Sequence, residues 1–145
     1  MKCCGIIPRL LPIAWIAVLW ISPANARQEL SPTYTATVVE REFKGVEDIE
    51  PKEMAGIWLL QFLPGNAFVL LKDGEIMVDG YWTLKDDLLT LTRMTGPLVC
   101  SWDDAEKATY RVDIQGFSVA FRATEDVCEG RAAVLTRGTF RTVPR

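Results

Sequence analysis

Residues 107–122 carry the pattern that most constrains this fold, a strict alternation of apolar and polar side chains. A period of two is typical of a strand with one buried face, because successive side chains point to opposite sides. Gln115 and Gly116 interrupt the alternation and predict a two-residue turn that places Ile114 opposite Phe117. The expected inner face of this hairpin consists of Ala108, Tyr110, Val112, Ile114, Phe117, Val119 and Phe121.

A second hairpin is predicted around Asp73-Gly74, a pair that favours a type I′ turn because both residues tolerate positive φ. Residues 67–72 lead into this turn and residues 75–84 return from it. The turn places Leu71 opposite Ile76 and Val69 opposite Val78, with all four side chains on the inner face of the sheet. Trp82 and Leu84 continue that face.

Two further positions shape the returning strand and the next one. Gly80 interrupts an otherwise apolar inner face, which predicts a bulge or a sharp bend of the kind that closes barrels. Asp86-Asp87 then reverses the chain, aligning Leu84 with Leu89 and bringing Leu91 beside them. We therefore expect a third strand after Asp87.

Three more strands are predicted, at Ile57–Leu63, Arg131–Arg137 and Thr139–Val143. The chain then has about eight short strands joined by tight turns, and no long amphipathic helix interrupts them. This pattern predicts an all-β fold, a single antiparallel up-and-down β-barrel. A chain of 145 residues is long enough for one such domain.

The first 26 residues have the pattern of a signal peptide. Lys2 and Arg9 precede an apolar run from Leu10 to Ile21, and Ala24 and Ala26 form the small-residue pair that signal peptidases recognise. The alternative, an uncleaved anchor, is less favoured because the run is shorter than the roughly 20 residues that span a bilayer. We expect an exported bacterial protein, periplasmic or extracellular, without a stable membrane anchor after cleavage.

Residues 27–55 differ in composition from the rest, because acids outnumber bases between Glu40 and Glu53. Two interpretations stay open: an acidic N-terminal arm, or a strand at Thr35–Glu40 followed by a short helix near Pro51–Ala55. The expected organisation is therefore a signal peptide over residues 1–26, this segment over 27–55, and the barrel over 56–145.

Composition excludes several kinds of function. The chain contains no His, which excludes a Ser-His-Asp hydrolase and a His-ligated metal site. Removal of the signal leaves 14 of the 16 basic residues against 19 acids, a net charge of −5, which disfavours nucleic acid as a partner. We expect no cofactor and no metal.

Cys100 and Cys128 are the two cysteines that remain after removal of the signal peptide. In an oxidising compartment they predict one disulfide, and two unpaired buried thiols are the alternative. The bridge would close a loop of 27 intervening residues and stabilise the fold by roughly 3 kcal/mol through the entropy of the unfolded chain.

Gly56-Ile57-Trp58, followed by antiparallel strands, resembles the start of calycin barrels, which include lipocalins, fatty-acid-binding proteins and avidins. The order of several short motifs is similar to small exported bacterial lipocalin-like domains, over roughly residues 56–143. These motifs are Gly56-x-Trp58, Phe68-x-Leu70-x-x-Asp73-Gly74, Gly80-Tyr81-Trp82, Thr109-Tyr110-Arg111 and Asp126-x-Cys128-x-Gly130-Arg131.

The resemblance implies a structural role for one tryptophan and one arginine. In lipocalins the Trp of the G-x-W motif packs across the closed end of the barrel, under an arginine from near the last strand. Trp58 matches the first role, and Arg141 or Arg137 the second, through a cation–π contact. The lipocalin T-D-Y motif is missing, so no ligand-contacting residue is transferred.

Barrels of this size hold one small apolar ligand or fill with side chains. The function we expect is non-catalytic binding of such a ligand, and a filled core is the alternative for the same residues. The expected ligand contacts are Trp82, Tyr110, Phe121, Val78 and Leu91. Tyr110 is the most informative, because a buried hydroxyl needs a hydrogen-bond partner that a ligand can supply.

Two other function classes remain as alternatives. A protein-interaction or inhibitor module would act through the N-terminal arm and the loop from Gly96 to Asp104, with Trp102 as an exposed anchor or, alternatively, as a lid on the barrel. A calycin-fold cyclase or isomerase is less favoured, and we assign no catalytic residue. The acidic pairs Asp86-Asp87, Asp103-Asp104 and Glu125-Asp126 fall in expected turns, where carboxylates are usually solvated.

Overall fold

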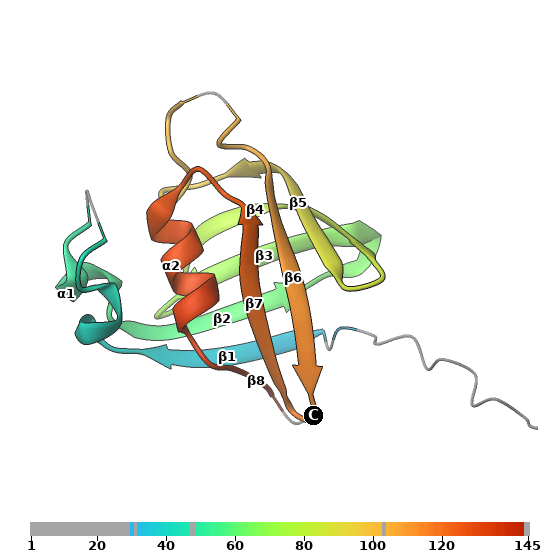
Figure 1. Ribbon diagram of the computed structural model, residues 1–145, viewed down its shortest axis with the longest axis horizontal. Helices are drawn as coiled ribbons and strands as arrows, with labels where there is room; N and C mark the ends of the chain where they lie inside the picture. Colours follow the sequence, from blue (N-terminus) through green and yellow to red (C-terminus); the bar gives the residue numbers. More distant parts are fainter. Residues whose placement is uncertain (1–29, 31, 47–48, 103, 144–145) are drawn as a thin grey trace, which may run out of the picture.

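Eight antiparallel strands close into a barrel within residues 30, 32–46, 49–102 and 104–143, which the computed structural model describes (Figure 1). The expected fold class is therefore confirmed. The expected signal peptide, residues 1–26, lies outside the described residues. The strands follow one another around the barrel in chain order: β1 Thr33–Val38, β2 Gly56–Phe62, β3 Ala67–Lys72, β4 Glu75–Lys85, β5 Leu88–Thr95, β6 Ala108–Gln115, β7 Ser118–Glu125 and β8 Phe140–Thr142.

Strands β6 and β7 form the expected hairpin, with a turn one residue later than expected. Gln115 pairs with Ser118, so Gly116 and Phe117 make the turn, and Ile114 faces Val119. Most residues of β6 therefore face a residue of β7 two positions later than expected. Because side chains alternate with a period of two, a shift of two leaves all side chains but one on the expected face. Phe117 is the exception, since it leaves the ladder and is 83% exposed at the tip of the hairpin.

The β3–β4 hairpin has the expected turn but a different inner face. Asp73 and Gly74 both have positive φ, 50° and 91°, and Leu71 pairs with Ile76 as expected. Leu70, not Val69, faces Val78, because Met77 has no opposite residue and forms a bulge. The assignment of Val69, Leu71 and Ile76 to the core is therefore wrong; Phe68 and Leu70 are buried in their place.

Gly80 lies at the expected irregularity, where the register between β4 and β5 shifts. A Cβ at this position would lie 2.8 Å from the carbonyl oxygen of Thr92 and 3.1 Å from the ring of Phe68. The glycine therefore allows β5 to approach at the bend. Beyond it, Leu84 pairs with Leu89 across the Asp86-Asp87 turn, as expected.

The expected strand at Arg131–Arg137 is wrong, because residues Glu129–Arg137 form helix α2. Arg131, Val134 and Leu135 are buried, and their spacing of three and four residues matches one face of a helix rather than a strand. Glu129 in the first turn and Arg137 in the last turn suit the helix dipole. The last strand, β8, then covers only Phe140–Thr142 and pairs with both β1 and β7 to complete the barrel.

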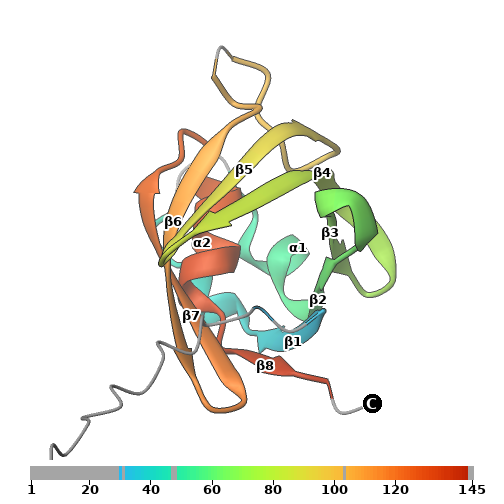
Figure 2. The same ribbon diagram turned by 90° about the vertical axis from the view of Figure 1, so that its right-hand side faces the viewer.

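Helical segments cover one end of the barrel (Figure 1). They are the 3-10 turn η1 Glu40–Phe43, the single-turn helix α1 Pro51–Met54, and α2; a further 3-10 turn, η2 Pro64–Asn66, joins β2 to β3. Phe43 and Met54 are buried in the core. Of the two interpretations of residues 27–55, the structure shows a strand and a short helix, and β1 belongs to the barrel (Figure 2).

Candidate functional site

Four of the five expected ligand contacts lie in a packed interior. Val78 and Tyr110 are fully buried, Leu91 is 1% exposed and Phe121 is 2% exposed. Accessible areas this small mean that no gap large enough for a water molecule lies beside these side chains. At these positions the structure shows the core alternative, without room for a ligand.

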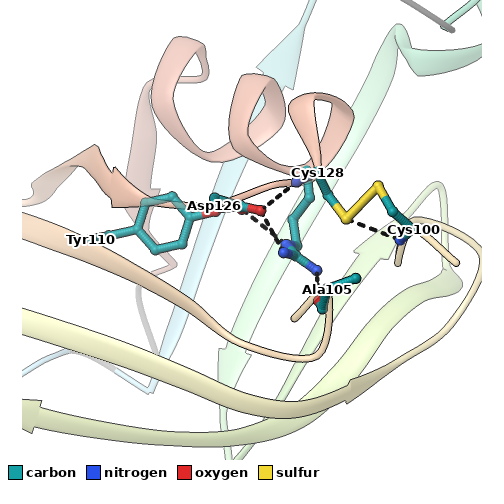
Figure 3. A network of polar contacts seen from close by, with 6 residues as sticks. Cys100, Ala105, Tyr110, Asp126 and Cys128 are labelled. Carbon is teal, nitrogen blue, oxygen red and sulfur yellow. Dashed lines mark hydrogen bonds and ion pairs between the residues drawn. A yellow bond between two sulfur atoms is a disulfide. The ribbon is translucent and has the colours of Figure 1, made fainter. Parts of the chain in front are cut away.

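The Tyr110 hydroxyl has its partner within the protein. It donates a hydrogen bond to Oδ2 of Asp126 (Figure 3). Burial raises the pKa of Tyr110 well above its ordinary value, and the negative charge of Asp126 raises it further. Tyr110 is therefore a neutral hydrogen-bond donor in the folded protein, and its hydroxyl is not available to a ligand.

Trp82, the fifth expected contact, differs from the other four. Its ring packs against Phe62 with the centroids 4.9 Å apart, and the side chain is only partly buried. Among the described residues, its Nε1 is the one buried side-chain polar atom without a hydrogen-bond partner. This indole N–H therefore retains the capacity to bind an acceptor.

A buried ion pair joins the turn before α2 to the helix itself. Asp126 and Arg131 have fully buried side chains, and the guanidinium contacts the carboxylate through Nε, at 2.9 Å, and through Nη2. The backbone N–H of Cys128 donates to Asp126 Oδ1 at 2.8 Å. With the Tyr110 hydroxyl, the carboxylate accepts four hydrogen bonds, which offset much of its desolvation.

The sequence did not reveal this pair. Asp126 was expected to be solvated in a turn, which is wrong, and Arg131 was assigned to a strand. The two residues are five positions apart, a spacing that puts them on opposite faces of a strand and gives no regular contact within a helix. Only the entry of the chain into α2 brings the carboxylate back over the guanidinium.

The same region holds the expected disulfide, Cys100–Cys128, with its Cα atoms 5.7 Å apart. Cys128 precedes the first residue of α2, and the backbone N–H of Cys100 donates to the Cys128 sulfur at 3.0 Å. Arg131 Nη1 also donates to the carbonyl oxygen of Ala105 at 2.8 Å. The segment from Gly96 to Ala105, here named the Cys100 loop, is therefore fastened to α2 at two points (Figure 3).

Trp102 stands exposed on the Cys100 loop, with 56% of its surface accessible. The interpretation of Trp102 as a lid on the barrel is therefore wrong. Hollows of about 560 and 630 Å³ adjoin the indole, and the apolar lining of the first consists of Ile49, Pro97, Leu98, Val99, Trp102 and Val127. Gly130 and Ile49 pack closely in the lining of this hollow, because a Cβ on Gly130 would lie 2.4 Å from Ile49 Cδ1.

The expected cation–π contact on Trp58 does not form. Trp58 is fully buried, and its Nε1–H donates to the carbonyl oxygen of Met54 at 3.0 Å. Arg137 donates instead to the carbonyl oxygen of Glu42, and Arg141 is exposed because Phe140 takes the inward position of β8.

Gly56 has a packing role. A Cβ at this position would lie 2.5 Å from Asp73 Oδ2, and the Asp73 carboxylate accepts a hydrogen bond from the backbone N–H of Ile57.

The arrangement of Tyr110 and Asp126 pairs a hydroxyl with a carboxylate, as an acid–base catalyst requires. Both side chains are sealed from solvent, and neither lines a hollow beside Trp102. A substrate therefore has no access to the pair, whose hydrogen bonds stabilise the fold.

No helix among the described residues is long and apolar enough to span a membrane. Comparison of the chain with known protein families, curated proteins and solved structures finds no match.

Proposed function

We propose that this protein is a non-catalytic binding module that holds a protein partner through the Cys100 loop. The exposed indole of Trp102, standing between two hollows, is the observation that carries this proposal. Tryptophan is enriched among residues that dominate binding energy at protein interfaces, because it buries a large apolar surface around one polar N–H.

The loop is restrained at two of its residues. The disulfide holds it at Cys100, and the guanidinium of Arg131 holds it at Ala105. Restraint at these two residues reduces the conformational entropy that the loop loses on binding, so more of the contact energy contributes to affinity.

The surroundings of Trp102 suit a protein surface better than a small molecule. Small-molecule sites usually enclose most of their ligand, whereas this loop projects from the barrel (Figure 2). The first hollow is mainly apolar, and Arg93, Asp104, Glu106 and Lys107 line the second. An apolar centre beside charged groups of both signs is the usual composition of a protein interface and its rim.

The N-terminal segment is packed on the barrel, whereas an inhibitor that binds through an acidic arm needs this segment to be free. Phe43 and Met54 fix it to the core, and Ile49 contributes to the wall of the first hollow. We therefore assign binding to the Cys100 loop, with residues near Ile49 as part of the same surface.

We also propose that the protein is exported and related to the lipocalin-like calycins. The signal pattern over residues 1–26 and the disulfide support export, because disulfides persist in oxidising compartments. The closed eight-stranded barrel with Trp58 buried near its helical end supports the family relation among the described residues.

The test begins with chemical cross-linking of the intact protein in the compartment where it accumulates, followed by identification and purification of the cross-linked partner. Calorimetry then compares the wild type with Trp102→Ala and with Phe117→Ala, a matched control that removes another exposed aromatic at a loop tip. We expect Trp102→Ala to weaken binding by about 30-fold, or roughly 2 kcal/mol, and Phe117→Ala to leave the affinity unchanged. Equal affinities for wild type and Trp102→Ala would refute the proposal.

A small apolar ligand at the barrel end near Trp82 is the second candidate, favoured by the unpartnered indole N–H. Native mass spectrometry of the same preparation tests it. A dissociable small-molecule adduct that persists in Trp102→Ala and disappears in Trp82→Phe would favour this candidate over the Cys100 loop.

A further inference from the structure

Apolar side chains cluster on the outer surface of three neighbouring strands, β2 to β4. We define the outer apolar face as Ile57, Leu59, Val69, Leu71, Ile76 and Tyr81. Ile57, Ile76 and Tyr81 are 59, 53 and 50% exposed, and the other three are partly buried.

Strand register makes these side chains neighbours. Leu59 pairs with Leu71, and Leu71 pairs with Ile76, so one apolar row crosses three strands. On β1 the row continues with Thr35, which pairs with Leu59. The bulge at Met77 creates this row, because it turns Leu71 and Ile76 outward while Val78 stays inside.

The opposite side of the barrel has ordinary solvent-facing strands. On β6 and β7 the residues between the buried positions include Arg111, Asp113 and Arg122, and alanines are the only apolar residues at the exposed positions. Strands β2 and β3 instead contain the apolar runs Ile57–Leu60 and Ala67–Leu71, a pattern typical of strands covered on both faces. Within the described part of the chain, only their inner face is covered (Figure 2).

Charge is almost absent from the outer apolar face. Among the described residues that point outward between Ile57 and Tyr81, Asp79 is the one charged side chain within the sheet, and it accepts a hydrogen bond from Thr95 at 2.6 Å. At its edge, Lys72 ends β3 and Glu75 begins β4, on either side of the turn that contains Asp73. The chain as a whole is acidic, with a net charge of −3.

We propose that the outer apolar face is the interface of a symmetric dimer of this chain. Two acidic copies repel each other over most of their surfaces, and this face lets them meet with little like-charge contact. A basic partner would need carboxylates on the face, and a polar partner would need hydrogen-bonding groups that the apolar row does not offer. In a two-fold dimer each apolar row packs on its own copy, with the sheets about 10 Å apart.

The size of the face sets the strength of the dimer. Together with β1, where Thr35 continues the row, four strands spaced about 4.8 Å apart and six residues long, at roughly 3.3 Å per residue, present on the order of 400 Å² per copy. The total of about 800 Å² is below the roughly 1,200–2,000 Å² of stable specific interfaces, so the dimer is weak and dissociates on dilution.

The test is sedimentation of the intact protein over a range from about micromolar to near-millimolar concentration. We expect the weight-average mass to rise from that of one chain toward that of two. Ile76→Glu places a charge at an exposed position on the face, and it weakens self-association by at least about tenfold. Phe117→Glu, the matched control, adds the same charge at an exposed apolar residue of another hairpin and associates as the wild type does.

Leu71→Glu gives a second test at the centre of the row. If this variant melts far below the wild type, Ile76→Glu decides the question, because its side chain is already half exposed. A wild type that stays monomeric throughout, or equal association of Ile76→Glu and wild type, would overturn the proposal. A monomer that binds lipid vesicles or another protein through Ile76 would overturn it as well. Trp102→Ala dimerises normally, so failure of the dimer and failure of the Cys100-loop proposal are distinguishable.

Discussion

The buried pair of Asp126 and Arg131 offers the sharpest test of what stabilises this fold. Asp126→Asn preserves the shape of the side chain and removes its charge. Arg131 then remains fully buried without a counter-ion, and the hydrogen bonds from Tyr110 and Cys128 weaken. The expected result is a large loss of stability, because an uncompensated charge in the interior is far costlier than the pair.

The magnitude follows from the burial of both side chains. Breaking a fully buried ion pair costs about 3–5 kcal/mol, whereas an exposed pair contributes about 0–1 kcal/mol. A domain of roughly 110 residues has an unfolding entropy near 0.23 kcal/mol/K, so the loss corresponds to a fall in Tm of about 13–22 °C.

Asp87→Asn is the matched control for this substitution. Asp87 also pairs with an arginine, Arg111, at 2.6 Å, but the two side chains are 48 and 62% exposed. Thermal and guanidinium unfolding of both variants measure the difference in the free energy of unfolding. We expect a loss below about 1 kcal/mol for Asp87→Asn.

A double variant separates the charge from the packing. Asp126→Asn combined with Arg131→Met removes the uncompensated cation, and it should recover part of the stability lost in Asp126→Asn alone. If Asp126→Asn unfolds within about 1 kcal/mol of Asp87→Asn, the argument from burial is refuted.

Two further predictions concern the same region. Cys100→Ser opens the loop of 27 intervening residues and should lower the free energy of unfolding by about 3–4 kcal/mol; an unchanged guanidinium midpoint relative to the oxidised wild type would contradict this. The raised pKa of Tyr110 means that its contribution is complete below about pH 10, the ordinary value, and is lost as pH rises toward the folded-state pKa. Wild-type stability should therefore fall more steeply above pH 10 than that of Tyr110→Phe, and equal slopes in alkaline unfolding experiments would argue against it.

The candidate binding surface was only partly foreseeable. Trp102 and the Cys100–Cys128 bridge were recognisable because a cysteine pair and an isolated tryptophan are visible in any sequence. The exposure of Trp102, and the contribution of Ile49 to the hollow beside it, depend on how distant segments pack. The expected ligand contacts were placed correctly inside the barrel at Val78, Leu91, Tyr110 and Phe121, but whether such an interior is hollow or filled depends on side-chain packing.

The all-β fold and its main hairpins follow from the sequence, because alternation and turn chemistry are local properties. The turn at Asp73-Gly74 and the alternation in β6 and β7 are set by φ preferences and a two-residue period, which need no distant contact. The β6–β7 turn lies one residue later than expected, but the same side chains face the barrel interior, since a register change of two residues matches the two-residue alternation of a strand.

The features that depend on closure of the barrel follow from contacts between distant segments. The bulge at Met77 reverses the faces of Leu71 and Ile76, and one inserted residue leaves no local signal in a continuous apolar run. Within α2, Arg131 binds the carboxylate of Asp126 and the carbonyl oxygen of Ala105, groups that only the folded chain brings together. Local preferences therefore fix the strands, and the cost of burying charge and polar groups fixes how the barrel is completed.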